Sequence, residues 1–200
     1  MRLDRVRARC GEKRFARGTL LCDSRHDPLA IAAGYAQVAE AAIAVLADAT
    51  VREFEAVHGK VAGGEILILA LGRLGGEALT HASDLDLIFL FTGDHSTESD
   101  GDRPLGGTQY FNRLTTRIVT ALSVQTAAGP LYEVDTRLRP SGAQGPMAVS
   151  VESFHKYQDE KAWTWEHMAL TRARPVYGSQ AARAGLVRNI EAILRKPREP

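Results

Sequence analysis

Cysteine, excess charge and catalytic signature motifs are all scarce in this sequence. It has only two cysteines in 200 residues, Cys10 and Cys22, and neither belongs to a CxxC pair. A disulfide scaffold and a zinc ribbon are therefore disfavoured, and a reducing cytoplasm is the expected compartment. The 25 basic and 24 acidic side chains leave a formal charge of +1. That balance indicates neither a general nucleic-acid surface nor an anionic-membrane surface.

Membrane-spanning and secretory signals are not expected either. The most apolar stretch, residues 29–51, contains Glu40 and Asp48 and is rich in alanine, which is only weakly hydrophobic. The arginine-rich first residues also include Asp4 and Glu12, and no apolar segment follows them. With 44% hydrophobic and 24% charged residues, the composition is that of a globular protein able to bury a sizeable core.

The motifs of several common nucleotide and hydrolase chemistries are missing. The sequence has no GxxxxGK[ST], no GxGxxG, no GxSxG and no HExxH. It therefore gives no support to a P-loop, a dinucleotide fold, a serine hydrolase or a zinc hydrolase. Any phosphate or metal chemistry has to be carried by other residues.

The strands are predicted from short apolar runs. Residues 65–71 (EILILAL) and 83–92 (SDLDLIFLFT) are typical of buried strands, and residues 131–137 (LYEVDTR) predict a third. The polar, turn-rich residues 93–107 predict a surface loop. Three short strands between helices indicate an α+β fold with a small mixed sheet.

The helices are predicted from capping residues and apolar spacing. Asp27-Pro28 is a helix start, and apolar residues recur at helical spacing from there to about His58-Gly59. Residues 108–127 form an amphipathic helix that Gly129-Pro130 ends. Two further segments, 151–173 and 179–195, also have helical patterns.

These elements suggest a division of the chain into four parts. Residues 1–26 have no strong periodicity and are expected to be an irregular lead-in, the cut end of a longer protein. Residues 27–60 form a leading helix, and residues 61–150 hold the core of the domain. Residues 151–200 are expected to be a helical extension that is truncated at its C-terminus.

Asp84 and Asp86 are the strongest candidates for chemistry. Residues i and i+2 of a strand point to the same face, about 6.6 Å apart along the chain. Two carboxylates this close repel one another unless a cation lies between them, and oxygen ligands suit Mg²⁺. Acidic residues at the start of a buried strand are costly, which favours a metal site. The alternative is that Asp84 caps a turn and Asp86 pairs with an arginine.

A second DxD, Asp100-Gly-Asp102, serves as an internal comparison. It lies in the polar loop beside glycine, with no strand to fix the two carboxylates. We assign it to the solvated surface. About half a DxD is expected by chance in a chain of this composition, so strand context has to distinguish the two pairs.

Asp135 is the third candidate acid, since a neighbouring strand could place it beside Asp84 and Asp86. Three carboxylates with two metals are the arrangement that clamps the attacking and leaving oxygens of a phosphoryl displacement. The alternative role for Asp135 is an ion pair with Arg137 or Arg139. Glu133 shares its predicted face, and an orienting or structural role is favoured there.

Several residues near these acids are candidates for phosphate binding. Glycines at Gly75 and Gly76 would let backbone N–H groups approach a triphosphate, although a Gly-Gly pair is usually only a turn. Ser83 could donate to a phosphate or simply start the strand. Alternation along the third strand puts Arg137 and Arg139 on the same side as Asp135, where guanidinium groups would bind phosphate oxygens or neutralise the acids.

Both tryptophans lie close together, at Trp163 and Trp165. Packing in a core or an interface is favoured for them over stacking on adenine. Arg172 and Arg174 are further cations of this region, and their direction cannot be read from the sequence.

Two segments resemble a known family. LALGRLGGEALTHASDLDLIFLF is similar to the glycine-glycine/DxD signature of nucleotidyltransferases of the DNA polymerase beta superfamily. It resembles more narrowly the glutamate–ammonia-ligase adenylyltransferases, and so do the nearly fifty residues that begin LYEVDTRLRPSG and include AWTWEHMAL. The resemblance runs from about residue 28 to the end. The second segment looks more like the C-terminal, adenylylating domain of that family.

The resemblance implies a polymerase-beta-like core and a specific chemistry. Asp84, Asp86 and Asp135 would be metal ligands, with Gly75, Gly76 and Ser83 as the phosphate cradle. Mg²⁺-ATP would be the AMP donor, a tyrosine of glutamine synthetase the acceptor, and a PII signalling protein the regulator. The family continues past the point where this sequence stops, at residues 196–200, and has a partner deadenylylating domain.

Three alternatives remain open at this stage. One is the reverse reaction of the family, phosphorolytic removal of AMP from glutamine synthetase. Another is a fragment that binds nucleotide or partner without catalysis. The third, an RNA-tailing nucleotidyltransferase, calls for a basic groove that a +1 chain does not indicate.

Overall fold

The computed structural model describes residues 3–23, 25–93 and 96–196. Part of the predicted surface loop, residues 94–95, and the last predicted residues, 197–200, lie outside the described chain. The elements in chain order are α1 (Leu3–Leu21), α2 (Pro28–His58), β1 (Ile66–Ala70), α3 (Gly72–Gly75), β2 (Leu85–Phe91), α4 (Gly107–Ser123), β3 (Val134–Asp135), the 3₁₀ turn η1 (Gly142–Gln144), β4 (Ala148–Ser150), α5 (Val151–Glu160), α6 (Thr164–Leu170), β5 (Arg174–Tyr177) and α7 (Gln180–Arg195).

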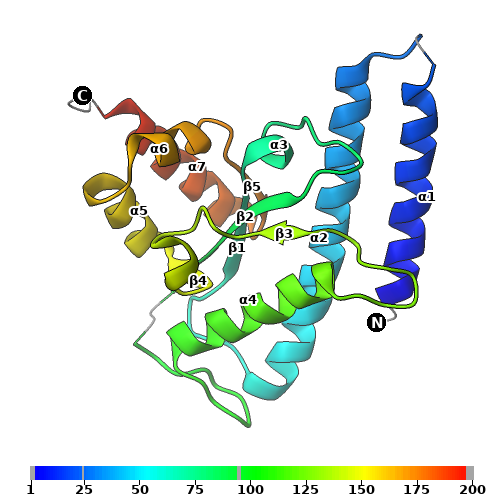
Figure 1. Cartoon of the computed structure of the whole chain (residues 1–200). Helices are drawn as coiled ribbons and strands as arrows, with labels where there is room; N and C mark the ends of the chain where they lie inside the picture. The colour runs from blue at the N-terminus through cyan, green and yellow to red at the C-terminus, as the bar shows by residue number, and fades with distance from the viewer. Residues whose placement is uncertain (1–2, 24, 94–95, 197–200) are drawn as a thin grey trace.

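The described strands form one small mixed sheet, as the sequence predicts. Its order is β3-β2-β1-β5, with β4 also paired to β2. Strands β1 and β2 are antiparallel, with Ala70 opposite Leu87, whereas β3 and β4 run parallel to β2. Figure 1 shows the sheet in the centre, with α2 and α4 on one side and α5, α6 and α7 on the other. The fold class is confirmed as α+β.

Alternation along the two central strands divides the core in two. On β1, Ile66, Ile68 and Ala70 pack into the larger cluster with α2 and α4. Leu67 and Leu69 pack into a second cluster that includes residues of α5 and α7. On β2 the odd-numbered residues belong to the first cluster, and Ile88 and Leu90 belong to the second. Even-numbered positions of β2 therefore face the α5–α7 side of the sheet.

The predicted boundaries of α2 are confirmed. The Asp27 side chain accepts a hydrogen bond from the N–H of Leu29 at 3.0 Å, and Pro28 occupies the first helical position. At the other end Gly59 has φ of 69°, a conformation that glycine adopts without strain, and its N–H donates to the carbonyl of Glu55. The long helix therefore begins and ends where its own sequence dictates.

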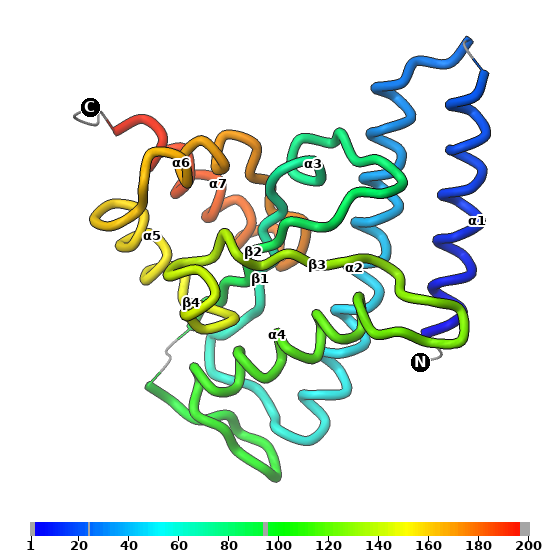
Figure 2. Tube along the Cα trace, viewed as in Figure 1, coloured from blue at the N-terminus to red at the C-terminus, as the bar shows by residue number. Residues whose placement is uncertain are grey.

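The expectation of an irregular lead-in is wrong for the described residues 3–21, which form α1. This helix packs side by side against α2, as both views show (Figures 1 and 2). Its anchor is polar: the Arg7 guanidinium is buried and donates to the carbonyls of Gly129 at 2.9 Å and Val124 at 2.7 Å. The buried residues of the described α1 are Arg7 and Cys10, so its sequence has no clear hydrophobic period.

The C-terminal part of the chain also differs from the prediction. The helix expected over 151–173 is interrupted, and its halves are α5 and α6. Strands β4 and β5 are not predicted from the sequence, because they are short and β5 contains Pro175. Proline is tolerated there because β5 lies at the edge of the sheet. The segment expected to be a helical extension thus contributes a strand next to β1.

One helix of the described chain, α2, is long and apolar enough to span a membrane by length and composition, contrary to the expectation that no stretch would be. Half of its most apolar stretch is buried inside the fold. A core helix passes the same test, so this is weak evidence for a membrane segment.

Candidate metal and nucleotide site

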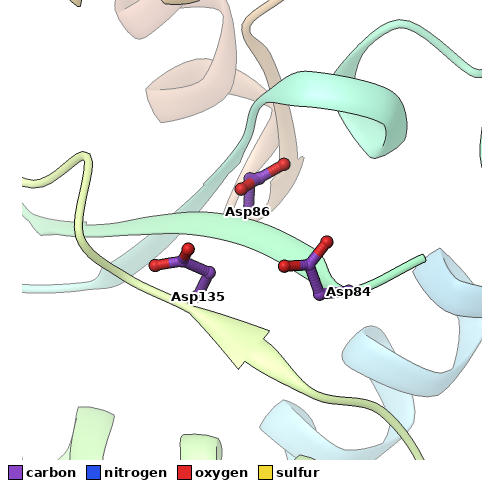
Figure 3. A group of neighbouring side chains, drawn as sticks. All are labelled: Asp84, Asp86 and Asp135. Atoms are coloured by element: carbon purple, nitrogen blue, oxygen red, sulfur yellow. The ribbon is translucent and has the colours of Figure 1, made fainter.

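The three predicted acids meet at one end of the sheet. Asp86 lies on β2 directly opposite Asp135 on the parallel strand β3, and Asp84 immediately precedes β2. One carboxylate oxygen from each of the three residues lies within 4.8 Å of the corresponding oxygens of the other two. In Figure 3 the three side chains lie close together along β2 and β3. The expectation that a neighbouring strand brings Asp135 to the pair is confirmed.

Backbone hydrogen bonds to neighbouring segments hold the acids in place. The N–H of Leu85 donates to the carbonyl of Glu133 at 2.9 Å, which joins the start of β2 to β3. On the other side, the N–H of Leu71 donates to the carbonyl of Asp86 at 2.9 Å. The apolar residues that follow Asp86 are buried in both cores. The backbone carrying the acids is therefore part of the rigid sheet.

The electrostatics of the cluster favour a bound cation. Burial raises the pKa of Asp86 above its ordinary value, and the neighbouring charges of Asp84 and Asp135 raise it further. Each of these effects disfavours the ionised carboxylate. A divalent cation among the three carboxylates would remove the repulsion, and a donor set made only of oxygen atoms fits Mg²⁺. The residues present therefore fit the metal that the sequence predicts.

Arg137 and Asp135 form the ion pair that the sequence analysis left open. The Arg137 Nε lies 3.0 and 2.8 Å from the two Asp135 oxygens, and the Arg137 backbone N–H donates to Oδ1 at 2.8 Å. Hydrogen bonds from Arg137 hold the pKa of Asp135 below its ordinary value. The arginine side chain is 81% exposed, so it is free to leave the carboxylate for a ligand.

Arg139 is predicted to lie on the same side of the strand as Asp135. This prediction is wrong, because β3 ends at Asp135 and the chain then turns. Its buried guanidinium donates to the carbonyls of Thr136, Ala143 and Gly145 and to the Thr136 hydroxyl. These bonds tie the loop that follows β3 into a closed unit. In this structure Arg139 is a loop anchor, and its assignment to ATP stays a prediction with no geometric support.

Gly75 and Gly76 lie at the end of the short helix α3. Their N–H groups donate to the carbonyls of Leu71 and Gly72 at 2.8 and 3.2 Å. Those two N–H groups are thus engaged within the turn. A Cβ at Gly75 would overlap the carbonyl oxygen of Arg172, so the glycine allows close packing against the turn that precedes β5. Phosphate binding by either glycine stays a prediction.

The glycine that touches the acid cluster is Gly72, which the sequence analysis does not single out. It has φ of 53°, and a Cβ there would overlap an Asp86 carboxylate oxygen. Only glycine lets the α3 turn lie directly against Asp86. The sequence signal was available, since Gly72 opens the same glycine-rich segment that follows β1.

The Ser83 side chain contacts Thr80 in the turn before β2. Its hydroxyl oxygen accepts from the Thr80 N–H at 3.1 Å and lies 2.7 Å from the Thr80 hydroxyl. The side chain thus closes the turn before β2. Donation to a phosphate by Ser83 stays a prediction.

The tryptophans do not pack in the core of the described chain. Trp163 is 71% exposed and Trp165 is 56% exposed. The buried anchor of α6 is instead Glu166, which accepts from the Tyr157 hydroxyl at 3.0 Å and from the Trp163 N–H at 2.8 Å. The expectation of core packing is therefore wrong, and interface packing stays open.

Arg174 has a direction that only the structure reveals. From the start of β5 its guanidinium reaches Glu40 on α2 at 2.5 Å and the carbonyls of Leu74 and Gly75 at 3.2 and 3.3 Å. One side chain thus connects the long helix to the end of the α3 turn, whose first residue is packed against Asp86. We infer that Arg174 holds the α3 turn in register with the acid cluster.

Replacing Arg174 with methionine should therefore loosen the α3 turn. For the AMP transfer that the family resemblance implies, we expect the KM for ATP to rise by about tenfold, roughly 1.4 kcal/mol, with a smaller change in kcat. Steady-state AMP transfer at varied ATP measures this, and Arg188→Met on the exposed side of α7 is the matched control. A lower melting temperature with an unchanged KM would contradict the positioning role.

The second DxD, Asp100-Gly-Asp102, is not part of the acid cluster found among the described residues, and one of its carboxylates makes a structural contact. Asp100 is exposed, and its carboxylate accepts the Lys60 N–H at 2.6 Å. This bond fastens the polar loop to the turn after α2. Asp102 is also exposed. Their assignment to the surface is confirmed by position.

Comparison with known proteins places the chain in context. Residues 27–188 match the family model described as glutamate-ammonia ligase adenylyltransferase. A protein of Brucella suis named bifunctional glutamine synthetase adenylyltransferase/adenylyl-removing enzyme is 46% identical over 198 residues, which is 98% of this chain and 20% of that protein. A protein of the same name from Xanthobacter autotrophicus is 45% identical over 200 residues, 99% of this chain and 20% of its own length. The chain spans about a fifth of these relatives.

Proposed function

This chain belongs to the glutamate-ammonia ligase adenylyltransferase family, and we propose that it transfers AMP from Mg²⁺-bound ATP to a tyrosine of glutamine synthetase. The observation that carries the proposal is the cluster of Asp84, Asp86 and Asp135, in which one carboxylate oxygen of each residue lies within 4.8 Å of the others and Asp86 and Asp135 occupy adjacent strands. Its position on rigid strands gives the fixed geometry that a phosphoryl displacement requires.

The proposed reaction forms one bond and breaks another. The tyrosine oxygen bonds to the α-phosphorus of ATP, the bond from that phosphorus to the β-phosphate oxygen breaks, and pyrophosphate leaves with the electron pair. Bound Mg²⁺ would neutralise charge on the phosphate oxygens. The chain's part is to hold the cation through Asp84, Asp86 and Asp135, and to offer Arg137 to the phosphates.

The phenol proton needs an acceptor, because the ordinary pKa of tyrosine is near 10. Asp135 has a pKa held low by Arg137, so it is the better metal ligand and the weaker base. Asp86, which lies opposite Asp135 on the neighbouring strand, has a raised pKa. We therefore propose that Asp135 acts mainly on the metal and the attacking oxygen, with the proton passing to solvent or to a neighbouring carboxylate.

The direction of the reaction is the finer part of the proposal. The relatives' names combine adenylyl transfer and adenylyl removal. The resemblance of the C-terminal segment to the adenylylating domain supports transfer. Phosphorolytic removal is the competing activity, and it would release ADP when adenylylated glutamine synthetase is mixed with phosphate. A PII protein as regulator and a cytoplasmic location belong to the same proposal.

The decisive assay is transfer of labelled AMP from ATP to purified glutamine synthetase. The proposal expects Mg²⁺-dependent labelling of a tyrosine and no labelled RNA when RNA is supplied instead. ADP release from the modified substrate, with no labelling by ATP, would favour the removing activity. Nucleotide binding with neither activity would identify a domain that binds without catalysis.

The raised pKa of Asp86 predicts how Mg²⁺ binding depends on pH. In the metal-free protein, burial and the charges of Asp84 and Asp135 disfavour the ionised form of Asp86. Asp86 therefore takes up a proton as the pH falls toward its raised pKa. Mg²⁺ then has to displace that proton in order to bind. We expect the Mg²⁺-induced rise in melting temperature to be largest at about pH 8 and to vanish toward about pH 4. Thermal melts with and without Mg²⁺ measure it, with Asp86→Asn as the control that lacks the rise. An equal rise at both pH values would contradict the assignment.

A further inference from the structure

A groove between α1 and α2 has an apolar floor that the rest of the described chain leaves uncovered. Its volume is about 530 Å³. Its floor consists of Val6 and Cys10 from α1 and Val38, Ala42 and Val45 from α2. Cys10 and Ala42 are buried, so the floor is recessed. The groove is separate from the acid cluster, whose residues do not line it.

The α2 side of this groove departs from the pattern of a core helix. Val38 and Val45 belong to the apolar positions at helical spacing, yet Val45 is 48% exposed and Val38 only half-buried. Half of the most apolar stretch of α2 remains unburied. An uncovered apolar surface on such a long helix indicates a contact surface.

The rim of the groove is basic. Arg5, Arg9 and Lys13 line it, and their spacing of four residues puts them along one edge of α1. All three side chains are exposed. Arg9 also contacts Glu12 at 3.0 Å, but both side chains are largely exposed, and such a pair contributes little stability. Two other basic residues of α1, Arg7 and Arg14, donate to carbonyls away from the groove.

We propose that this groove binds an amphipathic helix of a separate protein, with an apolar ridge flanked by aspartate or glutamate. The recessed floor fits a ridge of side chains from a packed helix. The three cations of the rim match carboxylates beside that ridge, and solvated charges of this kind favour fast, reversible, salt-sensitive association. None of the residues that line the groove in the described chain is acidic, so an acidic partner meets no like charge there.

Other occupants fit less well. A second copy of this chain would bring two basic rims together, which repel. An anionic bilayer takes up large apolar and aromatic side chains, whereas this floor consists of valine, alanine and cysteine. A nucleic acid would find phosphate contacts at the rim, but the apolar floor offers its bases no hydrogen bonds.

The test uses two synthetic helical peptides of about 18 residues with the same leucine ridge, one flanked by glutamate and the other by lysine. Fluorescence anisotropy of the labelled peptides is measured against the whole chain. We expect micromolar binding of the glutamate peptide, at least about tenfold weaker binding of the lysine peptide, and weakening by salt. Arg5→Ala with Arg9→Ala and Lys13→Ala should weaken the glutamate peptide by about tenfold or more.

The control removes the same charge elsewhere, with Arg183→Ala, Arg188→Ala and Arg195→Ala on α7. Val45→Glu, at an exposed position, should also abolish binding while circular dichroism stays unchanged. Equal binding of both peptides, or no effect of the rim variant, would overturn the proposal. So would binding to anionic vesicles without peptide binding, or dimerisation that the rim variant abolishes. AMP transfer is expected to be unchanged in the rim variant, so this test does not depend on the proposed reaction.

Discussion

Replacing Asp84 or Asp86 with asparagine is expected to remove nearly all AMP transfer while leaving the fold intact. Each substitution removes one of the charges that together would hold the cation. Removal of a charge from a repelling cluster need not destabilise the metal-free protein, and burial and its neighbours already raise the pKa of Asp86. A loss of at least about a thousandfold in turnover corresponds to roughly 4 kcal/mol in the barrier.

The measurement is single-turnover transfer of labelled AMP, beside a circular-dichroism melt and Mg²⁺ binding by calorimetry. The chain supplies its own control in Asp100→Ala with Asp102→Ala. These changes should alter transfer by less than about tenfold per folded molecule, although loss of the Asp100 bond to the Lys60 N–H should lower the melting temperature slightly. Equal losses at both pairs would show that the strand position of Asp84 and Asp86 has no bearing on the reaction.

Asp135→Asn is expected to cut turnover by orders of magnitude while changing ATP binding much less. The third acid is proposed to act on the metal and the attacking oxygen, and these interactions strengthen in the transition state. The variant also loses the ion pair with Arg137. Because that arginine is 81% exposed, the pair contributes little to stability, and only a small fall in melting temperature is expected.

Two variants separate the roles of Asp135. Glu133→Gln is the matched control, since this exposed neighbour lies just before β3 and should change turnover only mildly. Arg137→Ala removes the same ion pair but keeps the carboxylate. If Asp135 served only as a partner of Arg137, then Asp135→Asn would lower the melting temperature as much as Arg137→Ala does, and it would leave turnover near wild type.

The acid cluster illustrates how far sequence patterns reach. The strand period predicts that Asp84 and Asp86 share a face, and the apolar residues after them predict the strand itself. The approach of Asp135, some fifty positions away, was one possibility among several. Pairing of β3 with β2 in parallel register decided it, and strand pairing depends on contacts between distant segments.

The arginines show the opposite case. Arg137 and Arg139 look equivalent in an alternating strand, but β3 ends at Asp135, so one binds the acid and the other anchors a loop. Arg174 looked undirected, yet it joins α2 to the α3 turn. A long, flexible side chain finds partners wherever the fold brings carbonyls or carboxylates, and no local pattern encodes that.

The sequence by itself determined the elements whose signals are local. Helix α2 follows from its caps and spacing, β1 and β2 from continuous apolar runs, and the fold class from their order. Only the tertiary structure decided that residues 3–21 form a helix, that β4 and β5 join the sheet, and that α1 and α2 leave a basic-rimmed groove. The physical reason is that a buried arginine, an edge strand and an uncovered apolar face are stabilised by partners distant in sequence, whereas caps and periodicity act within a few residues.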